Sequence, residues 1–126
     1  MAINSRDKGQ RGERDWAKFS RAHGFPHNRR GQQYCGIEGQ DCVGIPGLHQ
    51  EVKWVETLRI DEAMAQAIRD AGEGLIPIVA HRKNQELSKE KKAKYYRPWK
   101  VTLRAEDFLA IYADALAYRE ILEVEP

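Results

Sequence analysis

The part of the chain best equipped for chemistry runs from Asp41 to Lys53. An Asp is followed by a turn rich in Gly and Pro, and then by a strand-like run over 49–55. Because side chains alternate between the two faces of a strand, Glu51 and Lys53 share one face and Val52 points to the other. Two acids that converge from neighbouring strands can hold a hard divalent cation such as Mg²⁺, and a Lys beside them can stabilise developing charge. Phosphodiester hydrolysis requires these components.

The same alternation has a second interpretation, since a strand with polar residues at every other position is also typical of a half-solvated sheet edge. A third acid, Glu13, bears on the choice. It lies three residues before Trp16 on the apolar stripe of an expected helix, where an acid is costly to bury unless a positive charge meets it. A Glu in the first turn of a helix is also favourable because of the helix dipole, so both interpretations of Glu13 stay open.

Asp41, then nine residues, then Glu51-Val52-Lys53 resembles the core of the PD-(D/E)XK nuclease superfamily. With Gly9, Gly12-Glu13 and Trp54, the pattern is similar to archaeal and phage Holliday junction resolvases over most of the chain. The resemblance implies a restriction-endonuclease-like, three-layer α/β/α fold around a central mixed five-stranded sheet.

The resemblance also implies roles for individual residues. Asp41 and Glu51 would ligate Mg²⁺, for which Mn²⁺ could substitute, and the carbonyl of Val52 would add a ligand. Glu13 would complete the metal site or lie just outside it. Lys53 would orient the attacking water or neutralise charge on the phosphorus, so that Glu13, Asp41, Glu51 and Lys53 form the expected catalytic set.

Two features fit the resemblance less well. Gln66 could correspond to a supporting Gln on the following helix, but it lies off that helix's apolar stripe. The resolvase branch has a Ser in the loop after its first strand, where this chain offers Arg and Gln residues instead.

The expected DNA-contacting residues are Lys8, Arg11, Arg29, Arg30, Gln33, Arg82 and Lys83.

Charge is segregated along the chain, although the net charge is only +2. Residues 1–34 carry eight bases and three acids, and residues 82–104 carry nine bases and two acids. The ranges 35–81 and 105–126 each have a net charge of −5. Two basic blocks around an acidic centre fit a phosphate-binding rim around a cation site, or simply a solvated surface.

The composition predicts one soluble domain over 1–126. Hydrophobic residues make up 41% of the chain and charged residues 32%, which is enough to bury a core without disulfides. The chain has neither an apolar run of membrane-spanning length nor a signal-like N-terminus, so we expect no membrane partner and a cytoplasmic location, in a bacterium or a phage-infected cell. Cys35 and Cys42 are expected to be buried apolar residues, although a hairpin could bring their sulfurs together.

The expected elements follow from hydrophobic periodicity and turn signals. Helices are expected over 11–23, 61–71 with Asp61 as N-cap, and 106–118 with Phe108, Ile111, Tyr112 and Ala115 facing the core. Strands are expected over 25–34, 41–43, 50–55, 75–81 and 99–103. The strand, helix and strand over 50–81 imply a right-handed crossover and a parallel pair. Residues 1–10 are expected to be a mobile arm, 82–98 a basic loop and 120–126 a frayed tail.

The sequence therefore predicts a Mg²⁺-dependent endodeoxyribonuclease that cuts branched DNA, a Holliday junction resolvase acting as a homodimer. One alternative is a restriction or repair nuclease that acts on duplex ends or flaps. Another is a nucleic-acid-binding module that keeps the fold without catalysis.

Overall fold

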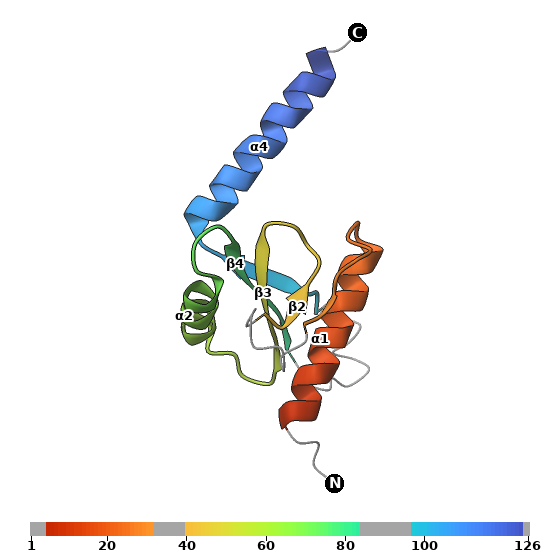
Figure 1. Ribbon diagram of the computed structural model, residues 1–126, viewed down its shortest axis with the longest axis vertical. Helices are drawn as coiled ribbons and strands as arrows, with labels where there is room; N and C mark the ends of the chain where they lie inside the picture. Colours follow the sequence, from red (N-terminus) through yellow and green to blue (C-terminus); the bar gives the residue numbers. More distant parts are fainter. Residues whose placement is uncertain (1–4, 32–39, 84–96, 125–126) are drawn as a thin grey trace.

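A computed structural model describes residues 5–31, 40–83 and 97–124, which form a five-stranded sheet and three helices (Figure 1). The elements in chain order are α1 (Ser5–Ala22), β1 (Arg29–Arg30), β2 (Cys42–Val43), β3 (Leu48–Val55), α2 (Ile60–Ala71), β4 (Ile76–Lys83), β5 (Lys100–Leu103) and α4 (Ala105–Val124).

The sheet has the order β1-β2-β3-β4-β5, and only β3 and β4 run parallel. The helix α2 makes the crossover between these two strands and packs on one face of the sheet, while α1 packs on the other (Figure 1). The predicted three-layer α/β architecture with a mixed five-stranded sheet is therefore confirmed, and so is the parallel pair.

Strand β3 is buried on both faces, and each face has its own partner. On the α1 face, the Trp16 indole N–H donates to the side-chain oxygen of Gln50 at 2.8 Å, and Val52 joins the core around Trp16. On the α2 face, Val79 of β4 packs with Ala63 and Ala67 of α2. The alternation places Glu51 and Lys53 on the α2 face, as the spacing predicts.

Polar side chains behind β3 fix its position against α1. Gln50 and Asn28 are both buried and are joined by two hydrogen bonds, and Asn28 also donates to Ser20 at 2.7 Å. Helix α1 also approaches β3 closely, because a Cβ added at Gly12 would lie 2.7 Å from the Trp54 Cβ.

Several expected boundaries at the start of the chain are wrong. Helix α1 begins at Ser5, so the expected arm is helical over 5–10 rather than irregular. It ends at Ala22, close to the expected Gly24, whose φ of 104° suits a residue that follows a helix. The expected strand over 25–34 is not formed at its start, because the chain turns there and the Asn28 N–H donates to the Phe25 carbonyl at 3.1 Å.

The later boundaries also need correction. Arg82 and Lys83 belong to β4 rather than to a basic loop, and 84–96 lie outside the described residues. Helix α2 begins at Ile60, so Asp61 lies in its first turn and is not the N-cap.

Helix α4 differs most from expectation. It continues to Val124, so 120–124 are helical rather than frayed. It projects away from the sheet (Figure 1), and Phe108 and Tyr112 are each about half exposed. The prediction that its apolar stripe faces the core of its own chain is therefore wrong.

Candidate metal and catalytic site

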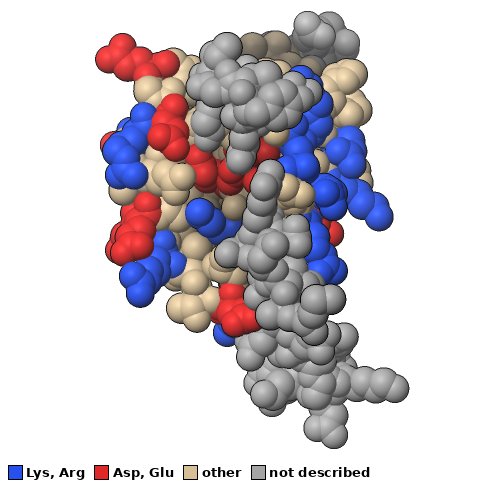
Figure 2. Space-filling model, turned by 60° about the horizontal axis from the view of Figure 1, so that its bottom comes forward, with Lys and Arg blue, Asp and Glu red and all other residues tan. Residues whose placement is uncertain are grey.

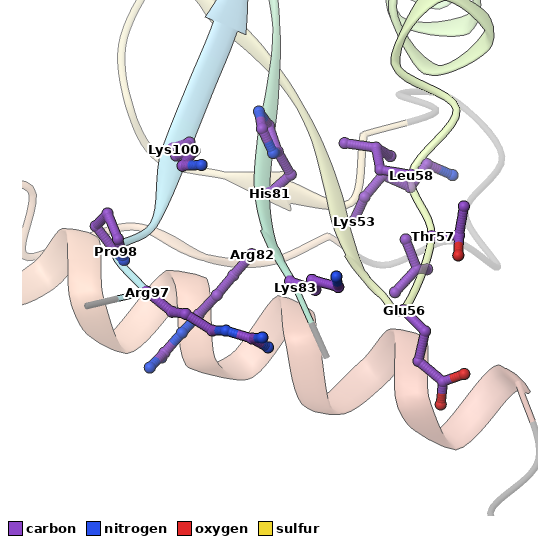
Figure 3. Close-up of a pocket in the computed structure, with 11 residues that line it drawn as sticks. Lys53, Glu56, Thr57, Leu58, His81, Arg82, Lys83, Arg97, Pro98 and Lys100 are labelled. Atoms are coloured by element: carbon purple, nitrogen blue, oxygen red, sulfur yellow. The ribbon is translucent and has the colours of Figure 1, made fainter. Parts of the chain in front are cut away.

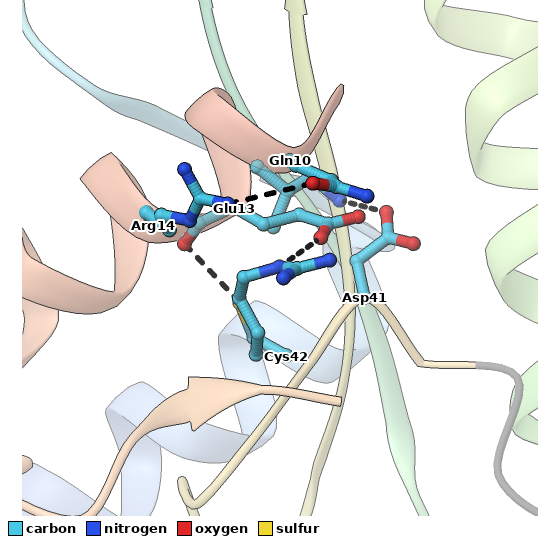
Figure 4. Close-up of polar contacts among 7 residues, drawn as sticks. Gln10, Glu13, Arg14, Asp41 and Cys42 are labelled. Atoms are coloured by element: carbon cyan, nitrogen blue, oxygen red, sulfur yellow. Dashed lines mark hydrogen bonds and ion pairs between the residues drawn. The ribbon is translucent and has the colours of Figure 1, made fainter. Parts of the chain in front are cut away.

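Asp41 and Glu51 come together from the adjacent strands β2 and β3, as their spacing predicts. Cys42 pairs with Gln50 across the antiparallel β2 and β3, which brings the preceding Asp41 beside Glu51 on the α2 face. The Asp41 Oδ2 accepts the backbone N–H of Val52 at 2.8 Å (Figure 4), and a side-chain hydrogen bond joins the two carboxyl groups. Glu51 is only 2% exposed.

This carboxyl pair retains protons that exposed acids would lose. Burial raises the pKa of Asp41 to about 7, and the negative charge of Glu51 adds to the shift. Burial also raises the pKa of Glu51 to about 7, although the hydrogen bond from Asp41 and the charge of Lys53 both oppose it. Two buried carboxyl groups in contact with each other do not both ionise easily, and a bound cation would favour their ionised forms.

Lys53 is the nearest cation on the same strand face. It is half-buried one side-chain repeat beyond Glu51, and its charge lowers the pKa of both Glu51 and Asp41. Glu51 and Lys53, which share one strand face, thus interact with each other and with Asp41 from the neighbouring strand.

Glu13 reaches toward this group from α1 (Figure 4). Its carboxylate is buried and accepts the Arg30 Nε–H at 2.8 Å, which supplies the positive charge that a buried acid needs. Burial raises the pKa of Glu13 and the charge of Asp41 adds to the shift. Glu13 therefore lies close enough for its charge to interact with that of Asp41. Its ion-pair partner, Arg30, is one of the predicted DNA contacts.

A second set of ligands shares Glu51. The side chains of His49, Glu51 and Asp70 offer ligand atoms within 4.8 Å of one another, so this cluster could hold a metal ion. The His49 Nε2 lies 3.1 Å from the Glu51 Oε1, and burial lowers the pKa of His49, which favours the neutral imidazole that binds metals. His49 is fully buried, and within the described part of the chain its Nδ1 has no hydrogen-bond partner.

Sequence reasoning missed His49 and Asp70, although both carry a signal. His49 precedes Glu51 by two positions and therefore lies on the same strand face. Asp70 lies three residues after Ala67 on α2, next to the stripe that packs on the sheet. Gln66 is half-buried one turn before Asp70, so it lies on the same side of α2.

The other expected DNA contacts are spread over the molecule. Arg11 and Arg29 are exposed, Lys83 is exposed at the end of β4, and Arg82 pairs with Asp15 of α1 at 3.3 Å. The Lys8 side chain and Gln33 lie outside the described residues. Figure 2 shows acidic side chains near the middle of one face, with more Lys and Arg to the right of them and a mixture of both charges to the left.

The possible partner of Cys42, Cys35, lies outside the described residues. Cys42 is a buried free thiol whose Sγ lies 3.5 Å from the Glu13 carbonyl oxygen, and burial raises its pKa to about 12. This agrees with the expected role as a small core residue.

Comparisons with known proteins add no identification, because no protein-family model, no curated protein and no solved structure matches the chain. Within the described residues, no helix combines the length and the apolar character that crossing a bilayer requires.

Proposed function

We propose that this protein is a metal-dependent endodeoxyribonuclease that hydrolyses phosphodiesters in branched DNA, as a homodimeric Holliday junction resolvase. The observation that carries the proposal is the convergence of Asp41 and Glu51 at one point of the sheet, with Lys53 beside them. Hydrolysis at such a site needs no covalent intermediate.

The donor set suits a hard divalent cation. Asp41 and Glu51 supply carboxylate oxygens, the ligands that Mg²⁺ prefers, and the Val52 carbonyl and Glu13 are further oxygen donors in the same region. His49 and Asp70 offer the same Glu51 a mixed nitrogen and oxygen set, which Mn²⁺ accepts more readily than Mg²⁺. A bound cation supplies polarisation of the scissile phosphate and a water of lowered pKa.

Side chains of the protein itself would position the bound groups and neutralise charge. Lys53 would donate from its ammonium to a non-bridging phosphate oxygen, and this donation would strengthen as negative charge grows on that oxygen. Asp41 and Glu51 must both be ionised to hold the cation, so its binding releases the proton that they retain. The Arg30 ion pair holds Glu13 in place next to Asp41.

The test is cleavage of a labelled four-way junction, a flap and a linear duplex, each in Mg²⁺ and in EDTA. We expect cleavage of the junction in Mg²⁺ alone. Asp41→Asn and Lys53→Met should each reduce the rate by at least about 10²-fold while junction binding in EDTA is retained. Asp61→Asn, the same change at an exposed acid of α2, is the matched control and should leave the rate unchanged.

The other outcomes separate the alternatives. Equal cleavage of linear duplex would replace the resolvase by a restriction or repair type of nuclease. Binding without cleavage in Mg²⁺ or Mn²⁺ would leave a non-catalytic nucleic-acid-binding module. Loss of binding together with activity, with a lower melting temperature, would identify a folding defect in that variant.

A further inference from the structure

A basic pocket opens next to the carboxyl site, at the ends of β3, β4 and β5. Its volume is about 410 Å³, and its lining includes Lys53, Lys83, Arg97 and Lys100 together with His81 (Figure 3). Among the lining residues that the structure describes, Glu56 is the one acid, so the positive side chains in this set outnumber the negative ones. A pocket of this size is large enough for a nucleotide-sized ligand.

The pairing of the strands arranges three of these residues in one row. Lys53 pairs with His81 across the parallel strands, and His81 pairs with Lys100 across the antiparallel ones. Paired residues point to the same face, and adjacent strands lie about 4.8 Å apart, so the two Lys side chains flank the imidazole across roughly 10 Å. Figure 3 shows His81 between Lys53 and Lys100.

Contacts within the pocket keep His81 in place and uncharged. Its Nε2 lies 2.9 Å from the Thr102 hydroxyl. Burial lowers the pKa of His81 and the positive charge of Lys100 lowers it further. The positive charge of the row therefore resides on the lysines, whose ammonium groups recognise phosphate oxygens as compact point charges.

We propose that this pocket binds a nucleotide phosphate adjacent to the scissile phosphate. The row that contains Lys53 is the next one along the sheet from the row that contains Glu51 and Val79. A DNA strand with its scissile phosphate at Asp41 and Glu51 would therefore enter the pocket past Lys53. This inference rests on the proposed function for the identity of the ligand as DNA, but its chemistry requires only a phosphate and a base-sized group.

The experiment measures binding without catalysis. In EDTA, a thymidine dinucleotide with a 5′-phosphate and the same dinucleotide without it are titrated into the ¹⁵N-labelled chain and followed by NMR. We expect the phosphorylated ligand to bind at least about tenfold more tightly, with the largest shifts around His81 and Lys100. Lys100→Glu should weaken that binding by about tenfold or more, and Lys18→Glu, at an exposed position of α1, should not.

Results of this experiment and of the cleavage assay are independent. Equal affinity for both dinucleotides, or shifts that map away from β4 and β5, would overturn the pocket proposal even if the protein cleaves junctions. Phosphate-dependent binding in a protein that cleaves nothing would support the pocket and reject the nuclease. Lys100→Gln removes the positive charge with little change of shape. If Lys100→Glu weakened binding but Lys100→Gln did not, that result would count against recognition by the ammonium.

Discussion

At the scale of single residues, the site is a set of acids placed where water cannot fully solvate them. Asp41, Glu51 and Glu13 all have a raised pKa, and in each case burial is the first cause. An arrangement of this kind opposes folding whenever the acids are ionised and nothing positive joins them. The free energy of unfolding should therefore depend on the ionisation of these acids even when no substrate is present.

We expect a pH effect on stability with a definite sign. The pKa of Asp41 rises from 3.8 to about 7 on folding, so between these values the folded state binds more protons than the unfolded state. The free energy of unfolding then falls as pH rises through about 7, and the contribution is fully present only below the unfolded value. Thermal melts in EDTA from pH 5 to pH 8 measure it.

Asp41→Asn is the matched variant for this measurement, because it cannot ionise. The difference between its melting temperature and that of the wild type should grow in favour of the variant as pH increases. Added Mg²⁺ should stabilise the wild type more at pH 8 than at pH 5, since the cation binds the ionised carboxyl groups. A difference that does not change with pH would contradict the raised pKa.

The two ligand sets around Glu51 predict different metal preferences. His49→Ala removes the only nitrogen donor of the cluster with Asp70, so we expect it to weaken Mn²⁺ binding more than Mg²⁺ binding. Asp41→Asn should weaken both. Calorimetric titration of each ion into each variant measures these preferences, and unchanged affinity for both ions in His49→Ala would assign the cation to Asp41 and Glu51 alone.

The residue scale also shows what a sequence can predict about this site. Alternation along one strand grouped Glu51 with Lys53, and a tight turn brought Asp41 back beside them, because both are local geometric relations. Asp70 comes from α2, and its approach to Glu51 depends on how a helix packs on the sheet. That relation has no short-range signal beyond the position of Asp70 near the buried stripe.

At the scale of elements, helix α1 combines two glycines with opposite surroundings. A Cβ at Gly9 would meet nothing within 4 Å, whereas one at Gly12 would lie 2.7 Å from the Trp54 Cβ. The intrinsic preference for helix is the same at both positions, so packing decides the difference between them.

We expect Gly9→Ala to stabilise the protein by about 1 kcal/mol, because Ala is the better helix former. Gly12→Ala should destabilise it by about 1–3 kcal/mol, because α1 must move away from β3. Urea unfolding of both variants measures the pair. A neutral Gly9→Ala would indicate that the helix begins nearer to Arg11, as the sequence alone suggested.

The element boundaries were predicted well where a single pattern dominates. The long strands β3 and β4 and the helix α2 were located within about two residues, since apolar periodicity is strong there. The first strand was overextended because Phe25 to Tyr34 contains β-forming residues, but Gly24 and Pro26 direct the chain into a turn. The start of α1 was missed because its first two turns are polar all round and show no apolar stripe.

At the scale of the whole molecule, α4 is the element without a place in the layers. Its exposed residues include large apolar side chains over four turns: Phe108, Leu109, Ile111, Tyr112, Leu116, Tyr118 and Ile121. They lie on more than one side of the helix, and a helix that is apolar on all sides is normally surrounded by protein. An exposed apolar surface of this kind predicts that α4 packs against a partner.

A second copy of this chain fits that role. The α1 face of each molecule has an apolar pocket of about 250 Å³, lined by residues that include Phe19, Val101 and Leu103 together with Ile111 of its own α4. The net charge is −4 on α4 and +3 on α1, so α4 of one copy and the α1 side of another are complementary. Reciprocal insertion of this kind would give a closed two-fold dimer.

We expect the protein to be a dimer by light scattering after size-exclusion chromatography. Combined Leu109→Glu and Leu116→Glu substitutions, and separately Val101→Glu in the pocket, should give monomers without loss of helix content. Asp61→Asn is again the control. A monomeric wild type would reject the dimer, and a dimer that survives Val101→Glu would mean that α4 pairs with α4 instead.

The polar cluster behind β3 has a consequence for how the acids of the candidate site are brought together. If β3 paired one residue out of step, Gln50 would take the place beside Asp41, and the Glu51 carboxylate would be buried against Trp16 and Asn28 without a cation. The hydrogen bonds of Gln50 therefore discriminate against the shifted sheet. The Gln50 amide thus couples folding of the sheet to assembly of the acids. A chain with the shifted pairing would lose both the native fold and the cluster of acids.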